Sequence, residues 1–153
     1  MIGRIGASAA AGLLAASAWA QVVFETEPLV VPMDDGMVTL TVEVADTPET
    51  RARGYMERTD IGPLDGMLFV FGPSRPVSMW MRNTPTSLDM IFIREDGSIE
   101  SIAERTVPHS RAIISSEGDV AFVLEVPGGS SERWGLEPGD VLSSLRFVPS
   151  APK

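Results

Sequence analysis

The sequence predicts a mainly β fold of the α+β class, a compact antiparallel sandwich or barrel-like sheet with two short helices. Apolar stretches of strand length recur along the chain, and turn residues (Gly, Pro, Asn and Asp) separate them. Helix-start and helix-stop residues flank two stretches, and both are short. A length of 153 residues, 44% of them hydrophobic, suits one globular domain rather than two.

Residues 1–20 have the pattern of a secretory signal peptide. Arg4 is their one charge, an apolar and small-residue stretch follows it, and Ala18-Trp19-Ala20 provides a small–x–small cleavage pattern before Gln21. The apolar run is shorter than the roughly 20 residues that a membrane-spanning helix needs. We therefore expect a mature chain of about 133 residues, located in the periplasm or secreted, with no membrane span after cleavage.

The mature chain is expected to hold a single domain, residues 37–148, between an N-terminal extension and a tail at 149–153. The extension, 21–36, contains two short apolar runs that predict strands at 22–24 and 29–31. Residues 37–45 alternate apolar and polar side chains, which predicts a half-buried strand. Asp46 or Thr47 can cap a short helix, Pro48 suits its first turn, and Gly54 is well placed to end it.

The rest of the chain predicts strands at 67–71, 77–81, 88–93, 98–103, 119–126 and 141–147. A tight turn at 95–97 joins two of them into a hairpin. Residues 128–135 predict a helix of one or two turns, capped by serine and ended by Gly135.

The composition excludes several classes of function. Twelve Lys+Arg against 21 Asp+Glu give a net charge of −9, which argues against nucleic acid or an anionic membrane as partner. There is no cysteine, so disulfides, thiolate zinc sites, iron–sulfur clusters and cysteine nucleophiles are excluded. His109 is the only histidine, which excludes multi-histidine metal sites. We expect no cofactor.

The densest group of chemically active residues lies between Ser78 and Asp89. On a strand, Trp80 and Arg82 share one face, and Asn83 follows them. An indole beside a guanidinium, an amide and a carboxylate suits a small sugar or carboxylate, through stacking and oriented hydrogen bonds. The alternative is structural: Trp80 packs in the core and Arg82 pairs with Asp89 or Glu125.

A second group places Arg51, Arg53 and Arg58 within eight residues of an otherwise acidic chain. Guanidinium groups can clamp a carboxylate or phosphate; the alternative is that these arginines balance Glu49 and Glu57 on a solvated helix face.

Three further chemistries are compatible with the residue types. Met79 and Met81, joined by Met67 or Met90 from neighbouring strands, offer thioethers to Cu(I), although methionine is also a core filler. Paired carboxylates among Asp89, Glu125 and Asp140 would suit a carbohydrate-active enzyme. A serine near His109 is available as a nucleophile, but no nucleophile-elbow motif surrounds any serine.

Several motifs in order resemble the family called domain of unknown function 192. They lie at residues 45–58, 66–71, 80–84, 88–89, 91–99, 123–129 and 139–140. Tyr55 stands where that family usually has Leu, and Arg82 where it often has Lys. The resemblance implies a small, mostly β fold, often exported in bacteria, with no established activity, substrate or cofactor.

Together these features predict a periplasmic binding or accessory module for a small anionic or polar, sugar-like ligand, with an envelope protein as a possible partner. The expected ligand-binding residues are Arg53, Arg58, Trp80, Arg82, Asn83, Asp89 and Glu125, with no catalytic and no metal-binding residue. Two alternatives stay open: a structural or protein-interaction module in which these residues form a buried polar network, and an enzyme with paired carboxylates.

Overall fold

The computed structural model describes residues 22–147, so the expected signal peptide at 1–20 and the tail at 149–153 lie outside it. Its centre is a six-stranded sheet in the order β1-β2-β3-β8-β5-β6, and β4 and β7 form a separate two-stranded sheet. The strands are β1 (Glu25–Met33), β2 (Gly36–Ala45), β3 (Asp65–Arg75), β4 (Ser78–Met79), β5 (Leu88–Ile93), β6 (Ile99–Ala103), β7 (Ile114–Ser115) and β8 (Val120–Pro127). The helices are α1 (Pro48–Arg53) and α2 (Ser130–Trp134).

The large sheet is antiparallel except between β2 and β3, which run parallel and are joined through α1. Its edges are β1 and β6, so the sheet is open and does not close into a barrel. The segment after α2 makes one backbone bridge near each edge, Ser143 with Val30 of β1 and Val141 with Ser98 beside β6. The mainly β fold expected from the sequence is confirmed.

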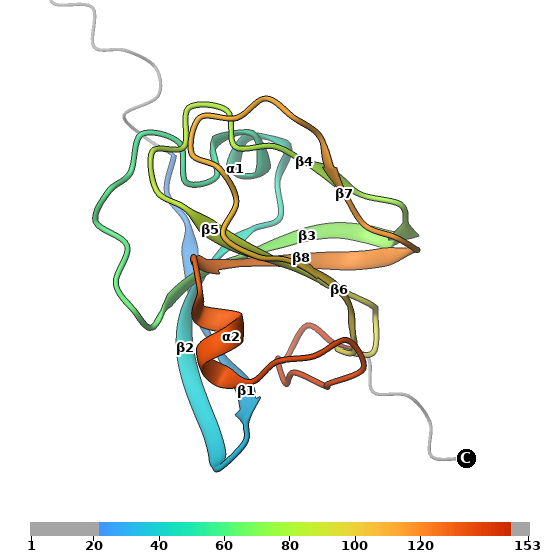
Figure 1. Ribbon diagram of the computed structural model, residues 1–153. Coiled ribbons are helices and arrows are strands. Elements are labelled where there is room, and N and C mark those ends of the chain that lie inside the picture. Colours follow the sequence, from blue (N-terminus) through green and yellow to red (C-terminus); the bar gives the residue numbers. More distant parts are fainter. Residues whose placement is uncertain (1–21, 148–153) are drawn as a thin grey trace, which may run out of the picture.

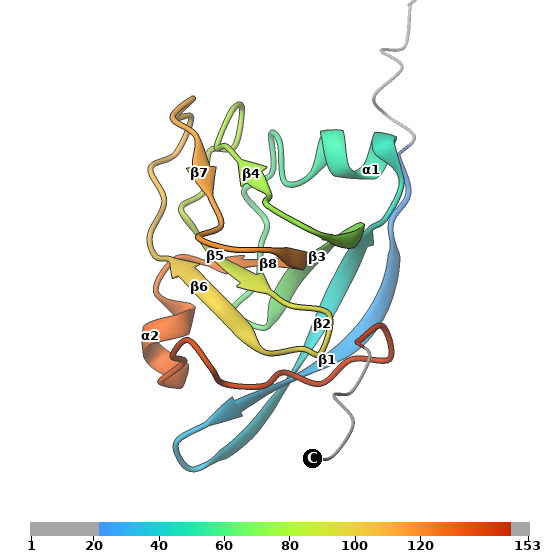
Figure 2. The same ribbon diagram turned by 90° about the vertical axis from the view of Figure 1, so that its right-hand side faces the viewer.

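Each face of the sheet is covered by different elements (Figures 1 and 2). We call the side that carries α1, β4 and β7 the α1 face, and the side that carries α2 and the C-terminal segment the α2 face. Strand β8 alternates between them: Leu124 and Val126 belong to the core of the α2 face, and Val123 to that of the α1 face. Because both faces are covered, β8 is buried along nearly its whole length.

Most of the expected elements are present. The alternating stretch 37–45 forms β2, and the stretches at 67–71, 88–93, 98–103 and 119–126 form β3, β5, β6 and β8 with small shifts at their ends. Helix α1 begins after Thr47, has Pro48 in its first turn and is followed by Gly54, as the sequence predicts. The expected turn at 95–97 is closed by a hydrogen bond from Gly97 N to the carbonyl of Arg94.

Four expectations were wrong in detail. The two short strands expected at 22–24 and 29–31 are replaced by one nine-residue strand, β1, which pairs along β2. The strand expected at 77–81 is only Ser78–Met79, because β4 pairs with just two residues of β7.

Residues 141–147 form no continuous strand: their buried side chains, Leu142 and Phe147, are five positions apart instead of two. Helix α2 has no serine cap, since its N-cap is Gly129 in the left-handed conformation, while the Ser131 hydroxyl bonds to Asp89. Neither α1 nor α2, the two helices of residues 22–147, has the length and hydropathy needed to cross a membrane.

Candidate functional site

Helix α1 is fixed at the side of the α1 face by local bonds. The hydroxyl of Thr47 accepts from Thr50 N at 3.1 Å, and the Thr50 hydroxyl accepts from Thr47 N at 3.0 Å, which completes a capping box. Gly54 follows with φ of 44°, and a Cβ there would lie 3.2 Å from the ring of Phe69. Glycine therefore permits both the turn after α1 and its close approach to β3.

Two segments that the sequence separates by about 25 residues lie side by side here. Glu57 N donates to the carbonyl of Asn83 at 2.8 Å, and the Thr86 hydroxyl donates to the carbonyl of Arg58 at 3.1 Å. Asn83 adopts φ of 55°, which turns the chain at this point. These bonds join the arginine-rich segment after α1 to the segment that contains Trp80 and Arg82.

A cavity of about 150 Å³ lies between these two segments and the sheet. Its lining combines arginine side chains, aromatic rings, thioethers and one carboxyl group: Arg51, Ala52, Arg53, Gly54, Tyr55, Met56, Phe69, Phe71, Ser78, Met79, Trp80, Arg82, Thr84 and Glu125. We call this cavity the α1 pocket. An apolar wall with a few converging polar groups is the usual make-up of a small-molecule site.

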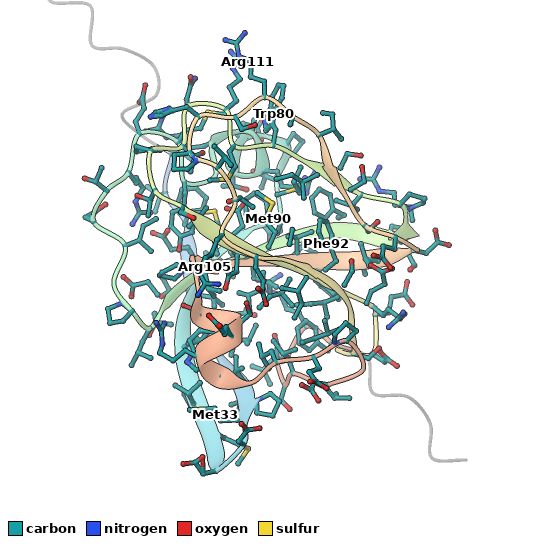
Figure 3. All side chains as sticks on the ribbon, in the orientation of Figure 1. Met33, Trp80, Met90, Phe92, Arg105 and Arg111 are labelled. Carbon is teal, nitrogen blue, oxygen red and sulfur yellow. The ribbon has the colours of Figure 1, made fainter. Side chains whose placement is uncertain are left out.

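Glu125 forms part of the pocket wall on the central strand β8. It pairs in register with Met67 on β3 and with Met90 on β5, so the three side chains form a row on the α1 face. Figure 3 shows Met90 and Trp80 on this same side of the sheet. Glu125 is only 4% exposed, and its carboxyl group makes no hydrogen bond or ion pair with any described residue. Burial raises the pKa of its carboxyl to about 8.

Tyr55 is the second polar group with no partner at this site. It is 2% exposed, and its buried hydroxyl has no hydrogen-bond partner within the described chain. Desolvation and the nearby carboxylates of Glu43 and Glu125 raise the pKa of the phenol, so the hydroxyl stays protonated. A buried, unsatisfied hydroxyl is costly, and a group that bonds to it on binding recovers that cost.

The arginines of the pocket differ in how firmly they are held. Arg51 donates to the carbonyls of Asp46 and Val70, so its position is fixed by the backbone. Arg53 pairs with the exposed Glu57 at 3.1 Å. The Arg82 guanidinium lies 5.4 Å from the ring centre of Trp80, which is 45% exposed, and no carboxylate within residues 22–147 pairs with it.

The structure thus brings four of the expected ligand-binding residues to one pocket: Arg53, Trp80, Arg82 and Glu125. Asn83 is exposed and contributes its backbone carbonyl to the joined segments, but it does not line the pocket. Arg58 forms ion pairs with Glu43 and Asp60. It lines a separate cavity of about 160 Å³, whose walls also include Tyr55, Thr26, Thr41 and Asp65.

Asp89 lies on the other face of the sheet. It pairs in register with Val126, one position from the row that contains Glu125, so its side chain points to the α2 face. One carboxylate oxygen accepts from Arg105 N and Gly129 N at 2.8 and 2.9 Å; the other accepts from Ser131 N and the Ser131 hydroxyl at 2.9 and 2.6 Å.

Burial by itself raises the pKa of Asp89, but the hydrogen bonds from Arg105, Ser131 and Gly129 outweigh it, so the pKa is held below its usual value. Asp89 therefore anchors the start of α2 and is not part of the α1 pocket. The pairing of Arg82 with Asp89 or Glu125 that the sequence allowed is absent from the described ion pairs.

The residues that a carboxylate-pair enzyme or a methionine copper site would need do not lie together. Asp89 and Glu125 point to opposite faces, and Asp140 lines a third cavity beside Trp134, so no two of these carboxylates face each other across one cleft. Met79 lines the α1 pocket, whereas Met81 is buried. Within residues 22–147 no cluster of three or more His, Asp or Glu could hold a metal ion.

Tyr55 is the site residue that sequence reasoning missed. It is the only tyrosine of the chain and follows the glycine that ends α1, but neither fact indicates an unpaired hydroxyl. For Glu125 a stronger signal existed, because one carboxylate interrupts the apolar run 120–126. A charged residue in a strand that is otherwise buried on both faces needs either a partner or a function.

The family model for domain of unknown function 192 (DUF192, Uncharacterized ACR) matches residues 30–144. The chain belongs to this family. Every residue of the α1 pocket lies within the matched range. The resemblance that the sequence motifs indicated is therefore confirmed, and the DUF192 description assigns no activity to the pocket.

Two solved structures share this DUF192 fold. A Sinorhizobium meliloti protein, named provisionally as a transcription regulator, is 47% identical with a TM-score of 0.77, covering 80% of this chain and 96% of its own. A protein of unknown function from Novosphingobium aromaticivorans is 31% identical with a TM-score of 0.75, covering 87% of this chain and 100% of its own. No curated protein matches the chain.

Proposed function

We propose that this protein is a binding module of the periplasm or cell exterior that holds a small organic anion in the α1 pocket. The observation that carries the proposal is the buried carboxyl of Glu125, which lines the pocket and makes no hydrogen bond or ion pair with any residue between 22 and 147. A folded protein rarely buries such a group without a partner. A ligand in the pocket would supply that partner.

The charge of the ligand follows from the other lining groups. Arg53 and Arg82 line the pocket with Glu125, and Arg82 has no ion-pair partner among the described carboxylates. At neutral pH the raised pKa of Glu125 keeps its carboxyl uncharged, so positive charge dominates this small region of an acidic chain. A guanidinium binds carboxylate and phosphate groups by two parallel hydrogen bonds.

The size of the ligand follows from the cavity. Its volume of about 150 Å³ is close to that of an engineered protein cavity that holds one benzene molecule. The walls include Phe69, Phe71 and Trp80, whose faces can stack on a planar ring or the apolar face of a sugar. The ligand is therefore a small molecule or the tip of a larger one.

The alternative of a purely structural polar network is favoured at Asp89, where every hydrogen-bonding direction is satisfied, and not at the α1 pocket.

The Sinorhizobium relative is named provisionally as a transcription regulator. The net charge of −9 argues against a direct contact of this chain with nucleic acid.

A panel of small molecules tests the proposal by isothermal titration and ligand-observed NMR: benzoate, phenyl phosphate, glucuronate and uncharged glucose. We expect at least one anion to bind and glucose to bind more weakly. Arg82→Ala should weaken the anion at least tenfold, because a hydrogen bond to a charged group contributes about 1.5–3 kcal/mol. The matched control is Arg111→Ala, since Arg111 is also exposed near this end but points away from the body (Figure 3) and does not line the pocket.

Binding by none of the anions, or equal losses of affinity in the Arg82 and Arg111 variants, would overturn the proposal.

Protein for these measurements should be recovered from the periplasmic or culture fraction of a bacterial host. The expected export then gives an N-terminus at Gln21, and an intact Met1 with cytoplasmic retention would contradict the location.

A further inference from the structure

We call Glu125 and Tyr55, which both line the α1 pocket, its floor, and Glu125 belongs to one row of residues that crosses the sheet. In register, Glu43 of β2 lies beside Met67 of β3, Met67 beside Glu125 of β8, and Glu125 beside Met90 of β5. Neighbouring strands are about 4.8 Å apart, so the backbones of Glu43 and Glu125 are separated by roughly 10 Å. Both carboxyl groups act electrostatically on the Tyr55 hydroxyl, and Tyr55 packs in the same core cluster as Met67.

The two glutamates of this row differ in their surroundings. Glu43 is half-buried and forms an ion pair with Arg58, so its charge is compensated. Glu125 has two methionines for its neighbours in the row, and burial in this apolar environment is the cause of its raised pKa, about 8. At neutral pH the Glu125 carboxyl therefore carries a proton and can donate a hydrogen bond.

Tyr55, which lines the same pocket, offers a second donor. Its buried hydroxyl has no hydrogen-bond partner among residues 22–147, and burial, followed by the carboxyl groups of Glu43, Glu125 and Asp65, raises the pKa of the phenol while Arg58 lowers it. Neither group of the floor therefore presents a negative charge at neutral pH. A neutral carboxylic acid and a tyrosine hydroxyl in an apolar site form the oxyanion hole of ketosteroid isomerase, where both donate to one ligand oxygen.

We propose that Tyr55 and Glu125 together bind one acceptor oxygen of the ligand, and that the ligand is an organic acid with this oxygen at the end opposite its carboxylate. The inference rests on the proposed function, which places the carboxylate at Arg82. It adds the identity of the group at the floor: a carbonyl, enolate, phenolate or second carboxylate oxygen. An ammonium group at the floor does not fit this arrangement, because it would bind well only if Glu125 gave up its proton.

The charged groups near the floor come from α1, β2, β3 and the segment after β4. Arg51 and Arg53 belong to α1, Arg82 follows β4, and Glu43 and Asp65 belong to β2 and β3 beside Tyr55. None of the three arginines forms an ion pair with Glu125 in this structure. The protonated state of Glu125 is therefore set by its burial, and deprotonation above about pH 8 converts the floor from a donor to an acceptor.

Three probes with one benzoate body test the inference. Benzoate has no group opposite its carboxylate, 4-formylbenzoate has a carbonyl acceptor there, and 4-(aminomethyl)benzoate has a cationic donor. At pH 6.5 we expect 4-formylbenzoate to bind about tenfold more tightly than benzoate, and the aminomethyl probe to bind more weakly than benzoate. Above about pH 8 the tenfold advantage of the formyl probe should disappear within about two pH units as Glu125 ionises.

Two variants assign the effect to the floor. Tyr55→Phe and Glu125→Leu should each remove most of the tenfold preference for 4-formylbenzoate over benzoate, measured as the ratio of the two affinities in the same variant. Circular dichroism and a urea midpoint establish that each variant is folded. If Glu125→Leu fails to fold, Tyr55→Phe alone decides the matter, because its hydroxyl makes no bond in the folded protein.

The outcomes separate the two proposals. If no benzoate probe binds, or if Arg82→Ala leaves the affinity for the probes unchanged, the proposed function is wrong and so is the inference that rests on it. If benzoate binds through Arg82 but the formyl group brings no gain, or the aminomethyl probe binds best, the anion-binding function stands and the inference about the floor is wrong.

Discussion

The two buried carboxylates, Asp89 and Glu125, lie on adjacent strands of the same sheet and are almost equally inaccessible. On the α2 face, Asp89 accepts four hydrogen bonds, three of them from the start of α2. On the α1 face, Glu125 accepts none from the described chain and borders a cavity. Their pKa values move in opposite directions, that of Asp89 down and that of Glu125 up.

The difference shows that burial of a charged residue has two separate meanings. Where the protein itself supplies the partners, the buried carboxylate holds elements together, as Asp89 holds β5 to α2. Where the protein leaves the partners out, the group costs stability, and the binding role proposed above would explain why the cost is tolerated. The sequence alone cannot separate these cases, because each carboxylate interrupts an apolar strand in the same way.

The largest effect is expected for Asp89→Ala. It leaves the amides of Gly129 and Ser131 and the Ser131 hydroxyl without an acceptor, and we expect a loss of roughly 4 kcal/mol or more in the free energy of unfolding. Urea denaturation at pH 7 measures it. Asp89→Asn, which keeps one acceptor oxygen, should lose about half as much. A loss below about 1 kcal/mol for the alanine variant would contradict the anchoring role.

Glu125→Gln is expected to act in the opposite direction. The pKa of Glu125 is near the ordinary 4.5 in the unfolded chain and about 8 in the folded protein, so between these values the folded protein holds a proton that the unfolded chain releases. The free energy of unfolding therefore falls by about 1.4 kcal/mol per pH unit as pH rises through that window.

Glutamine has no such proton, so the variant should be more stable than wild type by roughly 3 kcal/mol at pH 7 and by nearly nothing at pH 4. Urea denaturation of both proteins at pH 4, 6 and 8 measures the difference. A difference that does not grow with pH would show that Glu125 is ionised inside the folded protein.

Tyr55→Phe is expected to have the smallest effect on stability. The hydroxyl has no hydrogen-bond partner within the described chain, so its removal should change the free energy of unfolding by less than about 1 kcal/mol, towards greater stability. Thermal and urea unfolding of the two proteins measure this. A loss above about 1.5 kcal/mol would mean that the hydroxyl is bonded in the protein, and it would weaken the assignment of Tyr55 to the pocket floor.

The sequence was sufficient for features that depend on local order. The alternation of residues 37–45 predicted β2, and Thr47, Pro48 and Gly54 marked the limits of α1, because capping and backbone freedom act over a few residues. It failed for residues 141–147, whose contacts are with β1 and the turn before β6, both far away in the chain. It predicted the helix α2 but not its cap, which comes from Asp89, about 40 residues earlier.

By itself, the sequence determined the mainly β class, the family and the two segments in which cationic and aromatic residues gather, 51–58 and 80–84. Only the tertiary structure decided that these segments meet over β8, that Glu125 lies beneath them and that Asp89 does not. The physical reason is the geometry of a sheet: neighbouring residues of a strand point to opposite faces, and register decides which side chains become neighbours. Local sequence order determines neither which elements cover each face nor which distant strands pair.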